Sequence, residues 1–261
     1  MKNKINFLIS ILTFLIISSI STSASEKIKI GLLLPLSGEN KNIGTSVLRS
    51  VSMAVNKIDS SKIEILPKVK EVLRAEADAI NAVKIDSSYE EAINILFESS
   101  GKIITTGMGK AGFVAQKFAA IMSSTGTSSV FIHPAEAAHG DLGVISKNDS
   151  IVAFSTSGKT REVLEFIELS RHMTNGSVIG ITSHSDSGLR ELSDVIIDMG
   201  VIREPCPLGM TPTASMAVMA AVSDAIALVL MQKKGITLEE YGLRHHGGYL
   251  GRRARTDNSS D

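Results

Sequence analysis

Residues 102–112 read KIITTGMGKAG, a short apolar run that leads into a glycine turn. The β-branched residues at 103–106 favour a strand, and the glycines after them favour a tight turn. A helix is predicted to follow, from about 112 to 123. A buried strand that ends in a glycine turn and leads into a helix is the first half of a βαβ unit.

The same alternation of apolar run, turn and helix continues toward the C-terminus. Because such runs need burial on both faces, they predict a three-layer α/β/α fold with a parallel sheet of about five strands. The predicted strands are 102–106, 129–133, 151–155, 177–182 and 195–198. The predicted helices are 112–123, 161–172, 189–193 and 213–232, preceded by amphipathic helices through 69–83 and at 89–98.

The composition is that of a globular protein able to bury a core, since 43% of the 261 residues are apolar and 21% are charged. This balance excludes intrinsically disordered and collagen-like chains. The 27 basic and 27 acidic residues cancel, so no net charge draws the chain to nucleic acid or to an anionic membrane. The single cysteine, Cys206, excludes an internal disulfide.

The first residues have the order of a secretory signal segment: Lys2 and Lys4, an uncharged apolar run at 5–20, and small residues at 21–25. The apolar run is too short to span a bilayer comfortably, so we expect cleavage rather than a stable membrane anchor. The alternative is an apolar first helix that is buried in the fold. We assign residues 1–24 to this signal-like segment.

Residues 25–67 predict a second, smaller unit. The stretch 27–38 reads KIKIGLLLPLSG, a strand and a turn, followed by a predicted helix at 43–57 and a predicted strand at 63–66. This part resembles the opening βαβ unit of a type I periplasmic solute-binding protein. Because only one such unit is present, we expect a fragment without a complete ligand cleft. Solute binding by this fragment is a rival function that we expect to be absent.

The loop at 107–112 formally matches the dinucleotide pattern G-x-G-x-x-G. A dinucleotide site also needs an acidic residue about 20 residues further on, and His133 stands there instead. The P-loop pattern fails because Ile104 stands where its first glycine should be. We predict a turn around Gly109 that lets backbone N–H groups approach a small anion, with Lys110 beside it. The alternative is a structural turn with an exposed lysine.

A second loop, STSGKT at 155–160, again lies between a predicted strand and a predicted helix. The hydroxyls of Ser155, Ser157 and Thr160, together with open backbone N–H groups, suit a phosphate monoester. The alternative is a plain helix cap by Thr160. Because two such loops lie at one edge of the predicted sheet, we favour a binding site for a sugar phosphate over a loop that only caps a helix.

Ionisable residues gather in three further connections, at 133–143, 204–209 and 244–248, which hold four of the six histidines. No two histidines have the i, i+4 spacing of a helical zinc site, so we expect no required metal. Cys206 lies between two prolines without a neighbouring base. We therefore expect a packed thiol rather than a nucleophile.

Five motifs together are more specific than any one of them: TGMGKAG at 106–112, HPAEAAHGDLG at 133–143, STSGKT at 155–160, EPCPLGMTPTAS at 204–215 and GGYLGRR at 247–253. With them, residues 71–253 resemble the sugar isomerase (SIS) domain of D-arabinose 5-phosphate isomerases. The resemblance implies a cofactor-free aldose–ketose isomerase that interconverts D-ribulose 5-phosphate and D-arabinose 5-phosphate for 3-deoxy-octulosonate and lipopolysaccharide synthesis. We assign residues 68–261 to this domain.

The resemblance also implies a catalytic set, Lys110, Glu162, Glu204 and His245. Moving a carbonyl between C1 and C2 needs a base, an acid and positive charge near the enediolate. Glu162 is the first choice for the proton-shuttling carboxylate, and Glu204 for an assisting base or a substrate-orienting group. His245 would open the furanose ring or relay a proton, and Lys110 would hold phosphate or the developing oxyanion. Taken singly, either glutamate could instead be a solvated surface carboxylate.

The predicted substrate contacts are Gly109, Ser155, Ser157, Thr160 and His139. Two residues depart from the family pattern. Lys159 stands where Glu is usual, which could tighten phosphate binding or disturb the carboxylates, and His246 stands where Pro is usual, which affects the rigidity of the loop. The pair of CBS regulatory modules found in longer members is not expected, because the chain ends soon after Arg253.

We expect a homo-oligomer, a tetramer by the family resemblance, because the helix at 213–232 is apolar nearly all round and needs burial on several sides. The rival function within this fold is a non-catalytic sugar-phosphate-binding domain. A pentose phosphate substrate predicts a cytoplasmic enzyme, whereas the signal-like segment predicts the periplasm.

Overall fold

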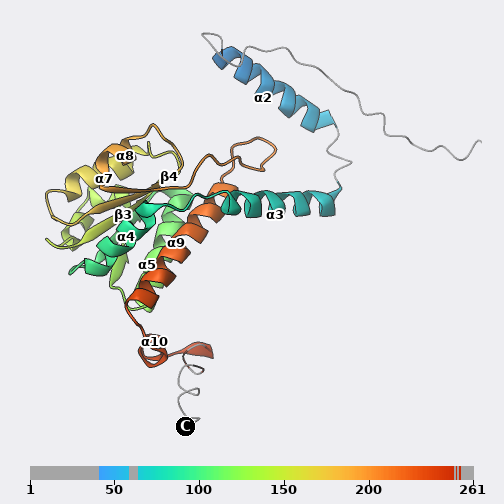
Figure 1. Cartoon of the computed structure of the whole chain (residues 1–261). Helices are drawn as coiled ribbons and strands as arrows, with labels where there is room; N and C mark the ends of the chain where they lie inside the picture. Colours follow the sequence, from blue (N-terminus) through green and yellow to red (C-terminus); the bar gives the residue numbers. More distant parts are fainter. Residues whose placement is uncertain (1–40, 59–63, 250, 252, 254–261) are drawn as a thin grey trace, which may run out of the picture. The chain divides into compact units, whose positions relative to one another are not determined.

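The computed structural model describes residues 41–58, 64–249, 251 and 253 (Figure 1). Its contacts divide the chain into two compact units, residues 1–52 and 53–261. The signal-like segment at 1–24 and the strand predicted to open at Lys27 lie outside the described residues. The sheet and the candidate site both belong to the second unit.

Two helices precede the sheet along the chain. Helix α2, Lys41–Ile58, confirms the helix predicted at 43–57. The strand predicted at 63–66 is wrong, because helix α3 begins at Ile65 and runs to Asn81. The short alternation at 63–66 resembles a strand, but the helical spacing seen from residue 69 onward extends back to Ile65. Helix α3 therefore crosses the predicted domain boundary between residues 67 and 68.

Five parallel strands form one sheet: β1 Ile103–Gly107, β2 Ser129–Phe131, β3 Ser150–Phe154, β4 Val178–Thr182 and β5 Val195–Asp198. They confirm the five predicted strands, with bounds that differ by one or two residues at most. The order across the sheet is β2-β1-β3-β4-β5. The chain goes from β1 outward to β2 and then crosses to the other side of β1. This reversal places a topological switch point between β1 and β3.

Helices connect the strands. Those at predicted positions are α4 Ser87–Glu98, α5 Gly109–Ser124, α7 Arg161–Ser170, α8 Gly188–Leu192 and α9 Ala214–Lys233. The short α6 Pro134–Ala137, the 3-10 turn η2 Asp141–Val144 and α10 Leu238–Arg244 were not predicted. A signal for α10 was present, because Thr237 and Glu240 have the spacing of a capping box, which the structure forms.

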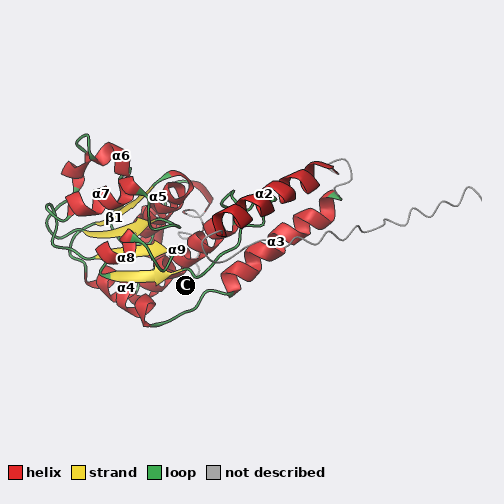
Figure 2. Cartoon of the chain, turned by 90° about the horizontal axis from the view of Figure 1, so that it is seen from above, coloured by secondary structure: helices red, strands yellow, loops and turns green. Residues whose placement is uncertain are grey.

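Apolar side chains form two clusters, one on each face of the sheet, and helices cover both faces (Figure 2). On β3, Val152 and Phe154 join the cluster that contains α4, α5 and α9. Ile151 and Ala153 join the cluster that contains α7 and α8. This alternation, with every residue of β3 buried, confirms the predicted three-layer fold.

Helix α9 is apolar on all sides, and it is long and apolar enough to cross a membrane. Half of its apolar window is buried inside the fold, and α3, α4 and α5 pack against it. These contacts identify α9 as a core helix of the layer. Leu228 and Val229 nevertheless remain 57% and 47% exposed on it.

Candidate functional site

The carboxyl ends of three adjacent strands finish level with one another. Gly107 of β1 pairs with Phe154 of β3, and Phe154 pairs with Ile181 of β4. The loops that leave these strands, at 107–109, 155–160 and 183–187, are therefore neighbours. Ligands of open parallel sheets bind at this edge, beside the switch point.

The glycines of the β1–α5 turn let helix α5 start directly against the end of β1. A Cβ on Gly112 would lie 2.5 Å from the carbonyl oxygen of Gly107, so no larger residue fits without moving the helix. Gly109 has a φ of 59°, and nothing lies within 4 Å of its ideal Cβ position. Close packing thus explains the G-x-G-x-x-G spacing without a dinucleotide. Lys110 is exposed in this open first turn.

The hydroxyls of the β3–α7 loop hold the loop itself in shape. Ser155 Oγ and Thr160 Oγ1 lie 2.9 Å apart, and Ser155 Oγ also accepts a hydrogen bond from the N–H of Gly158 at 3.1 Å. Ser157 Oγ accepts one from the N–H of Lys159 at 3.2 Å. Thr160 is the N-cap residue of α7, but its side chain makes no capping hydrogen bond. The N–H groups at the start of α7 therefore lack a side-chain cap, as an anion site requires.

Three further residues of this region have clear positions. Glu162 lies half-buried in the first turn of α7, directly after the loop. Lys159 Nζ lies 3.2 Å from Asp186 Oδ2 of the β4–α8 loop, and both side chains are exposed, so this ion pair adds little stability. His139 is exposed in the turn between α6 and η2. It comes after β2, the edge strand of the sheet, and does not line the hollow described below.

Glu204 is not a solvated surface carboxylate. Its Oε2 accepts hydrogen bonds from the N–H groups of Thr213 and Ala214, each at 2.8 Å, and its Oε1 accepts one from the N–H of Ser215 at 3.2 Å. These N–H groups lie at the start of α9, so the carboxylate caps this helix from a separate loop. An anion is stabilised there by the unpaired N–H groups and by the helix dipole.

Burial and hydrogen bonding act in opposite directions on the pKa of Glu204. Burial raises the pKa, whereas the nearby Ser215 hydroxyl and the hydrogen bonds from the N–H groups of Thr213, Ser215 and Ala214 lower it, and the net pKa lies below its ordinary value. A carboxylate held in its ionised form is a weak proton acceptor near neutral pH.

Replacing Glu204 by glutamine is expected to lower the free energy of unfolding at neutral pH by about 1 kcal/mol, as for the loss of a helix cap. Since the folded-state pKa is depressed, the contribution of the carboxylate is present above the unfolded pKa and is lost as the pH falls through the folded value. The urea midpoints of the parent and the variant should therefore differ at pH 7 and become equal at acidic pH. Equal urea midpoints of the parent and of Glu204→Gln at pH 7 would contradict the capping role. Glu165→Gln, at an exposed position, is the control for the loss of a carboxylate.

A hollow of about 410 Å³ opens at this edge beside Glu204. It is lined by Thr156 of the β3–α7 loop, by Ser183, His184 and Ser185 of the β4–α8 loop, and by Val201, Ile202, Glu204, Met210, Pro212 and Ser215 between β5 and α9. Of the four predicted catalytic residues, Glu204 alone lines it. Sequence reasoning missed His184, although its position after β4, at the carboxyl end of a strand, was a usable signal.

His245 lies apart from the other three predicted catalytic residues. It follows α10, with its ring stacked on Tyr241 at 3.9 Å between centroids. The neighbouring Arg244 lies against Gly126, just beyond the C-terminal end of α5. Lys110 is at the other end of this 16-residue helix, about 24 Å away at 1.5 Å per residue. Within one chain, the four residues therefore do not form one site.

Cys206 is half-buried in the loop between β5 and α9, and the prediction of a packed thiol stays a prediction. Hydrogen bonds from the hydroxyl of Thr211 and from the N–H groups of Met210, Thr211 and Leu208 lower its pKa to about 6. The thiol therefore lies in a loop that stabilises its thiolate. Within the part of the chain that the structure describes, no group of three or more His, Cys, Asp or Glu side chains could hold a metal ion.

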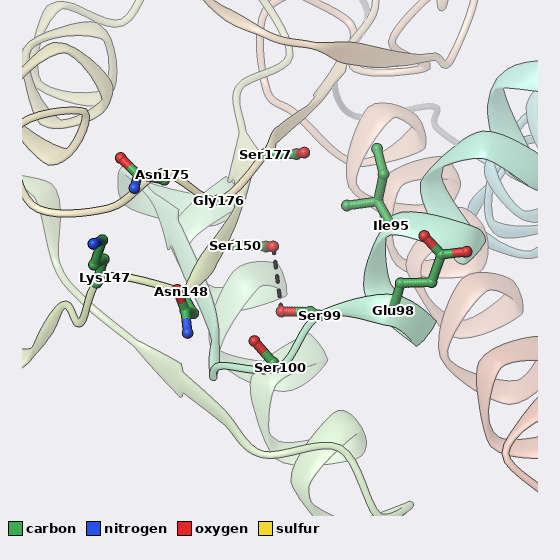
Figure 3. Close-up of a pocket in the computed structure, with 10 residues that line it drawn as sticks. All are labelled: Ile95, Glu98, Ser99, Ser100, Lys147, Asn148, Ser150, Asn175, Gly176 and Ser177. Atoms are coloured by element: carbon green, nitrogen blue, oxygen red, sulfur yellow. Dashed lines mark hydrogen bonds between the residues drawn. The ribbon is translucent and has the colours of Figure 1, made fainter.

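A separate polar hollow of about 290 Å³ lies at the opposite, amino edge of the sheet (Figure 3). It is formed by the end of α4 and by the connections that precede β3 and β4, and Ser150 donates a hydrogen bond to Ser99 at 3.3 Å beside it. None of the predicted site residues lines it. The candidate site is therefore the carboxyl edge, where ligands of such sheets bind.

The SIS domain model matches residues 95–229, which run from within α4 to near the end of α9. Among curated proteins, the chain is 36% identical over 196 residues to arabinose 5-phosphate isomerase KdsD of Pseudomonas aeruginosa, covering 74% of this chain and 60% of that protein. It is 38% identical over 186 residues to the protein of the same name from Escherichia coli K12, and this match covers 70% of this chain and 56% of that protein. The chain thus spans less than two thirds of the length of these relatives.

Among solved structures, the chain is similar to the c3406 protein of E. coli CFT073 in complex with arabinose 5-phosphate. The TM-score is 0.67 at 34% sequence identity, and the match covers 70% of this chain and 97% of that one. These matches give no support to the resemblance between residues 27–66 and a periplasmic solute-binding protein.

Proposed function

Because the chain belongs to the SIS domain family, we propose that it is an aldose–ketose isomerase that interconverts D-ribulose 5-phosphate and D-arabinose 5-phosphate. The observation that carries this proposal is the meeting of two anion-ready loops, 107–109 and 155–160, at the switch point between β1 and β3. A carboxylate, Glu162, follows the second loop, and a cation, Lys110, follows the first. The similarity to the KdsD proteins and to the structure with bound arabinose 5-phosphate supports the same substrate.

The proposed chemistry needs one carbon-bound proton to move between C1 and C2. Glu162 takes a proton from C1 of the ketose, which leaves an enediolate, and returns a proton to C2, while the proton of the C1 hydroxyl is transferred to O2 to give the aldose. Lys110 stabilises the negative charge of the phosphate or of the enediolate oxygen. Glu204, already held as an anion at the start of α9, orients substrate hydroxyls rather than accepting the proton. Gly109, Ser155, Ser157 and Thr160 shape the loops that receive the phosphate.

The test of this function is isomerisation by the full chain in deuterated water. D-ribulose 5-phosphate should yield D-arabinose 5-phosphate with deuterium at C2, observed by NMR, without any added cofactor. Binding of D-arabinose 5-phosphate without turnover or exchange would instead identify a sugar-phosphate-binding domain. Absence of both binding and turnover would overturn the proposal.

We further propose that the active form is a homo-oligomer, a tetramer by family resemblance. Exposed apolar side chains on α3 and α9, among them Leu66, Leu73 and Leu228, support burial against other copies. The remote position of His245 supports the same conclusion. If His245 takes part in the reaction, a second copy must bring it to the carboxyl edge of the sheet.

Mixing two inactive variants is expected to restore activity. Glu162→Gln and His245→Asn each remove one residue of the proposed site, and a mixed assembly contains sites in which both residues are intact. If subunits exchange at random, about one quarter of the sites are restored, because each site draws its two residues from different copies. Turnover after mixing, denaturing and refolding measures this fraction. No recovery, from variants that each refold as oligomers, would show that His245 does not act across subunits.

We propose that the product feeds 3-deoxy-octulosonate and lipopolysaccharide synthesis, and that the enzyme acts in the cytoplasm with its pentose phosphate substrate. The signal-like residues 1–24 favour the periplasm instead. A mass measurement of the N-terminus of the natural protein distinguishes the two locations, since export would remove this segment.

A further inference from the structure

The β4–α8 loop, residues 183–187, is fastened to the β3–α7 loop by its backbone. The N–H of Ser183 donates to the carbonyl oxygen of Thr156 at 3.0 Å, and the N–H of Leu189 donates to that of Gly158 at 3.0 Å. A Cβ on Gly158 would lie 2.5 Å from Cβ of Ser187, so the two loops touch without space between them. The β4–α8 loop is therefore a fixed wall of the candidate site.

His184 has a defined position within this wall. Its carbonyl oxygen accepts a hydrogen bond from Arg190 Nε at 2.6 Å and one from Ser187 Oγ at 3.4 Å. Arg190 in turn forms an ion pair with Asp198, the last residue of β5, at 2.6 Å. The main chain of His184 is thus tied to the ends of two strands, β4 and β5.

One ring nitrogen of His184, Nδ1, makes a hydrogen bond. Nδ1 lies 2.9 Å from the carbonyl oxygen of Thr156. Because a carbonyl oxygen can only accept, Nδ1 carries the hydrogen, and Nε2 of the neutral ring is left as a hydrogen-bond acceptor. The ring is exposed and lines the 410 Å³ hollow together with Glu204.

A pentose phosphate carries several hydroxyls, so a sugar chain in the hollow can donate hydrogen bonds to acceptors besides Glu204. The carboxylate oxygens of Glu204 already accept from the N–H groups at the start of α9. Ser183 Oγ, which also lines the hollow, is shielded from solvent and has no hydrogen-bond partner in the described part of the chain. A shielded polar atom without a partner is satisfied when a polar ligand enters.

We propose that His184 determines sugar specificity by accepting a hydrogen bond at Nε2 from a hydroxyl of the substrate. This inference rests on the proposed isomerase function and adds to it the residue that recognises the sugar chain beyond the reacting carbons. The phosphate binds at the two loops beside the switch point, and the hydroxyls at C3 and C4, between the phosphate and the reacting carbons, face the β4–α8 loop and the hollow. Ser183 Oγ supplies a second contact to the same chain.

Two substitutions at His184 separate contact with the sugar from support of the loop. His184→Asn keeps an amide N–H in the place of Nδ1, able to donate to Thr156, but removes Nε2. His184→Gln places its amide near the position of Nε2. We expect the asparagine variant to raise the KM for D-arabinose 5-phosphate about tenfold, more than it lowers kcat, and the glutamine variant to recover most of that loss. A residue that only supports the loop would give the opposite order.

Inorganic phosphate is the probe that separates the sugar from its phosphate group. As a competitive inhibitor it occupies only the phosphate position, so His184→Asn should leave its inhibition constant unchanged while the KM for the sugar phosphate rises. Weaker inhibition by phosphate in this variant would place His184 at the phosphate and overturn the inference. His172→Asn, an exposed histidine after α7, is the matched control.

The outcomes also distinguish this inference from the proposed function. If the parent chain turns over D-arabinose 5-phosphate and His184→Asn has the same KM, the inference on His184 fails and the isomerase function stands. If the parent neither binds nor isomerises the sugar phosphate, the proposed function fails and the inference fails with it. If the parent binds without turnover, the same variants are compared by calorimetric binding of D-arabinose 5-phosphate, with the same expected order.

Discussion

Replacing Glu162 by glutamine is expected to lower kcat for isomerisation by about 10²- to 10⁴-fold, the usual contribution of a positioned general base. Glutamine keeps the size and the hydrogen-bonding reach of glutamate but cannot take up the proton from C1. Binding of D-arabinose 5-phosphate should therefore persist while deuterium exchange at C1 and C2 is lost. NMR in deuterated water measures exchange, and calorimetry measures binding on the same samples.

The matched control for this experiment lies on the same helix. Glu165 is exposed on α7 and lies 3.7 Å from Arg161 in an i, i+4 pair, away from the loop. Glu165→Gln should leave exchange at the parent rate, because surface pairs of this kind contribute little. Parent-rate exchange in Glu162→Gln as well would remove Glu162 from the chemistry and favour a sugar-phosphate-binding domain.

Removing the charge of Lys110 is expected to lower kcat/KM by about 10²-fold or more, as for other fixed charges that stabilise a developing oxyanion. Lys110 is exposed in the first turn of α5, and no carboxylate of the described residues lies within ion-pair distance of it. Its charge is therefore available to a substrate anion. Steady-state kinetics of Lys110→Ala in both directions of the reaction measure the loss.

Two further variants show whether position or charge matters. Lys110→Arg keeps the positive charge and should recover part of the activity, though less than all of it because the guanidinium has a different shape. Lys117 lies on the same helix, paired with Asp224 of α9 at 2.5 Å, so Lys117→Ala tests the general loss of a cation from α5. Parent-like turnover of Lys110→Ala would reduce the β1–α5 loop to a structural turn, a role that the packing of Gly112 on Gly107 already explains.

The five strands were predictable because each is a short, continuous apolar run bounded by turn residues, the pattern of a strand buried on both faces. The same reasoning failed at Ile65 and Leu66, the last two residues of the strand predicted at 63–66, because they begin helix α3. A strand needs a partner in a sheet, and a local pattern does not show whether a partner exists. A helix makes its own backbone hydrogen bonds, so its longer period prevails.

The candidate site was predictable to a different extent at each residue. Lys110 and Glu162 follow strands directly, so the rule that ligands bind at carboxyl ends places both at the right edge. For Glu204, the sequence is compatible with a surface carboxylate and with a catalytic base. The structure makes it the cap of α9, through N–H groups that lie nine to eleven residues away along the chain. His245 was grouped with the site by resemblance, yet within one chain it lies at the opposite end of α5.

Features that depend on neighbouring residues can be predicted from the amino-acid order: the periods of the strands and helices, the glycine turns after β1 and β3, and the positions of the two anion-ready loops. Tertiary structure alone decided the order β2-β1-β3-β4-β5, the bond of His184 to Thr156 and the use of Glu204 as a cap. The difference lies in how far apart along the chain the interacting residues are. Turns and periodic burial are set by a few consecutive residues, whereas these contacts join segments that become neighbours only when the parallel strands pair.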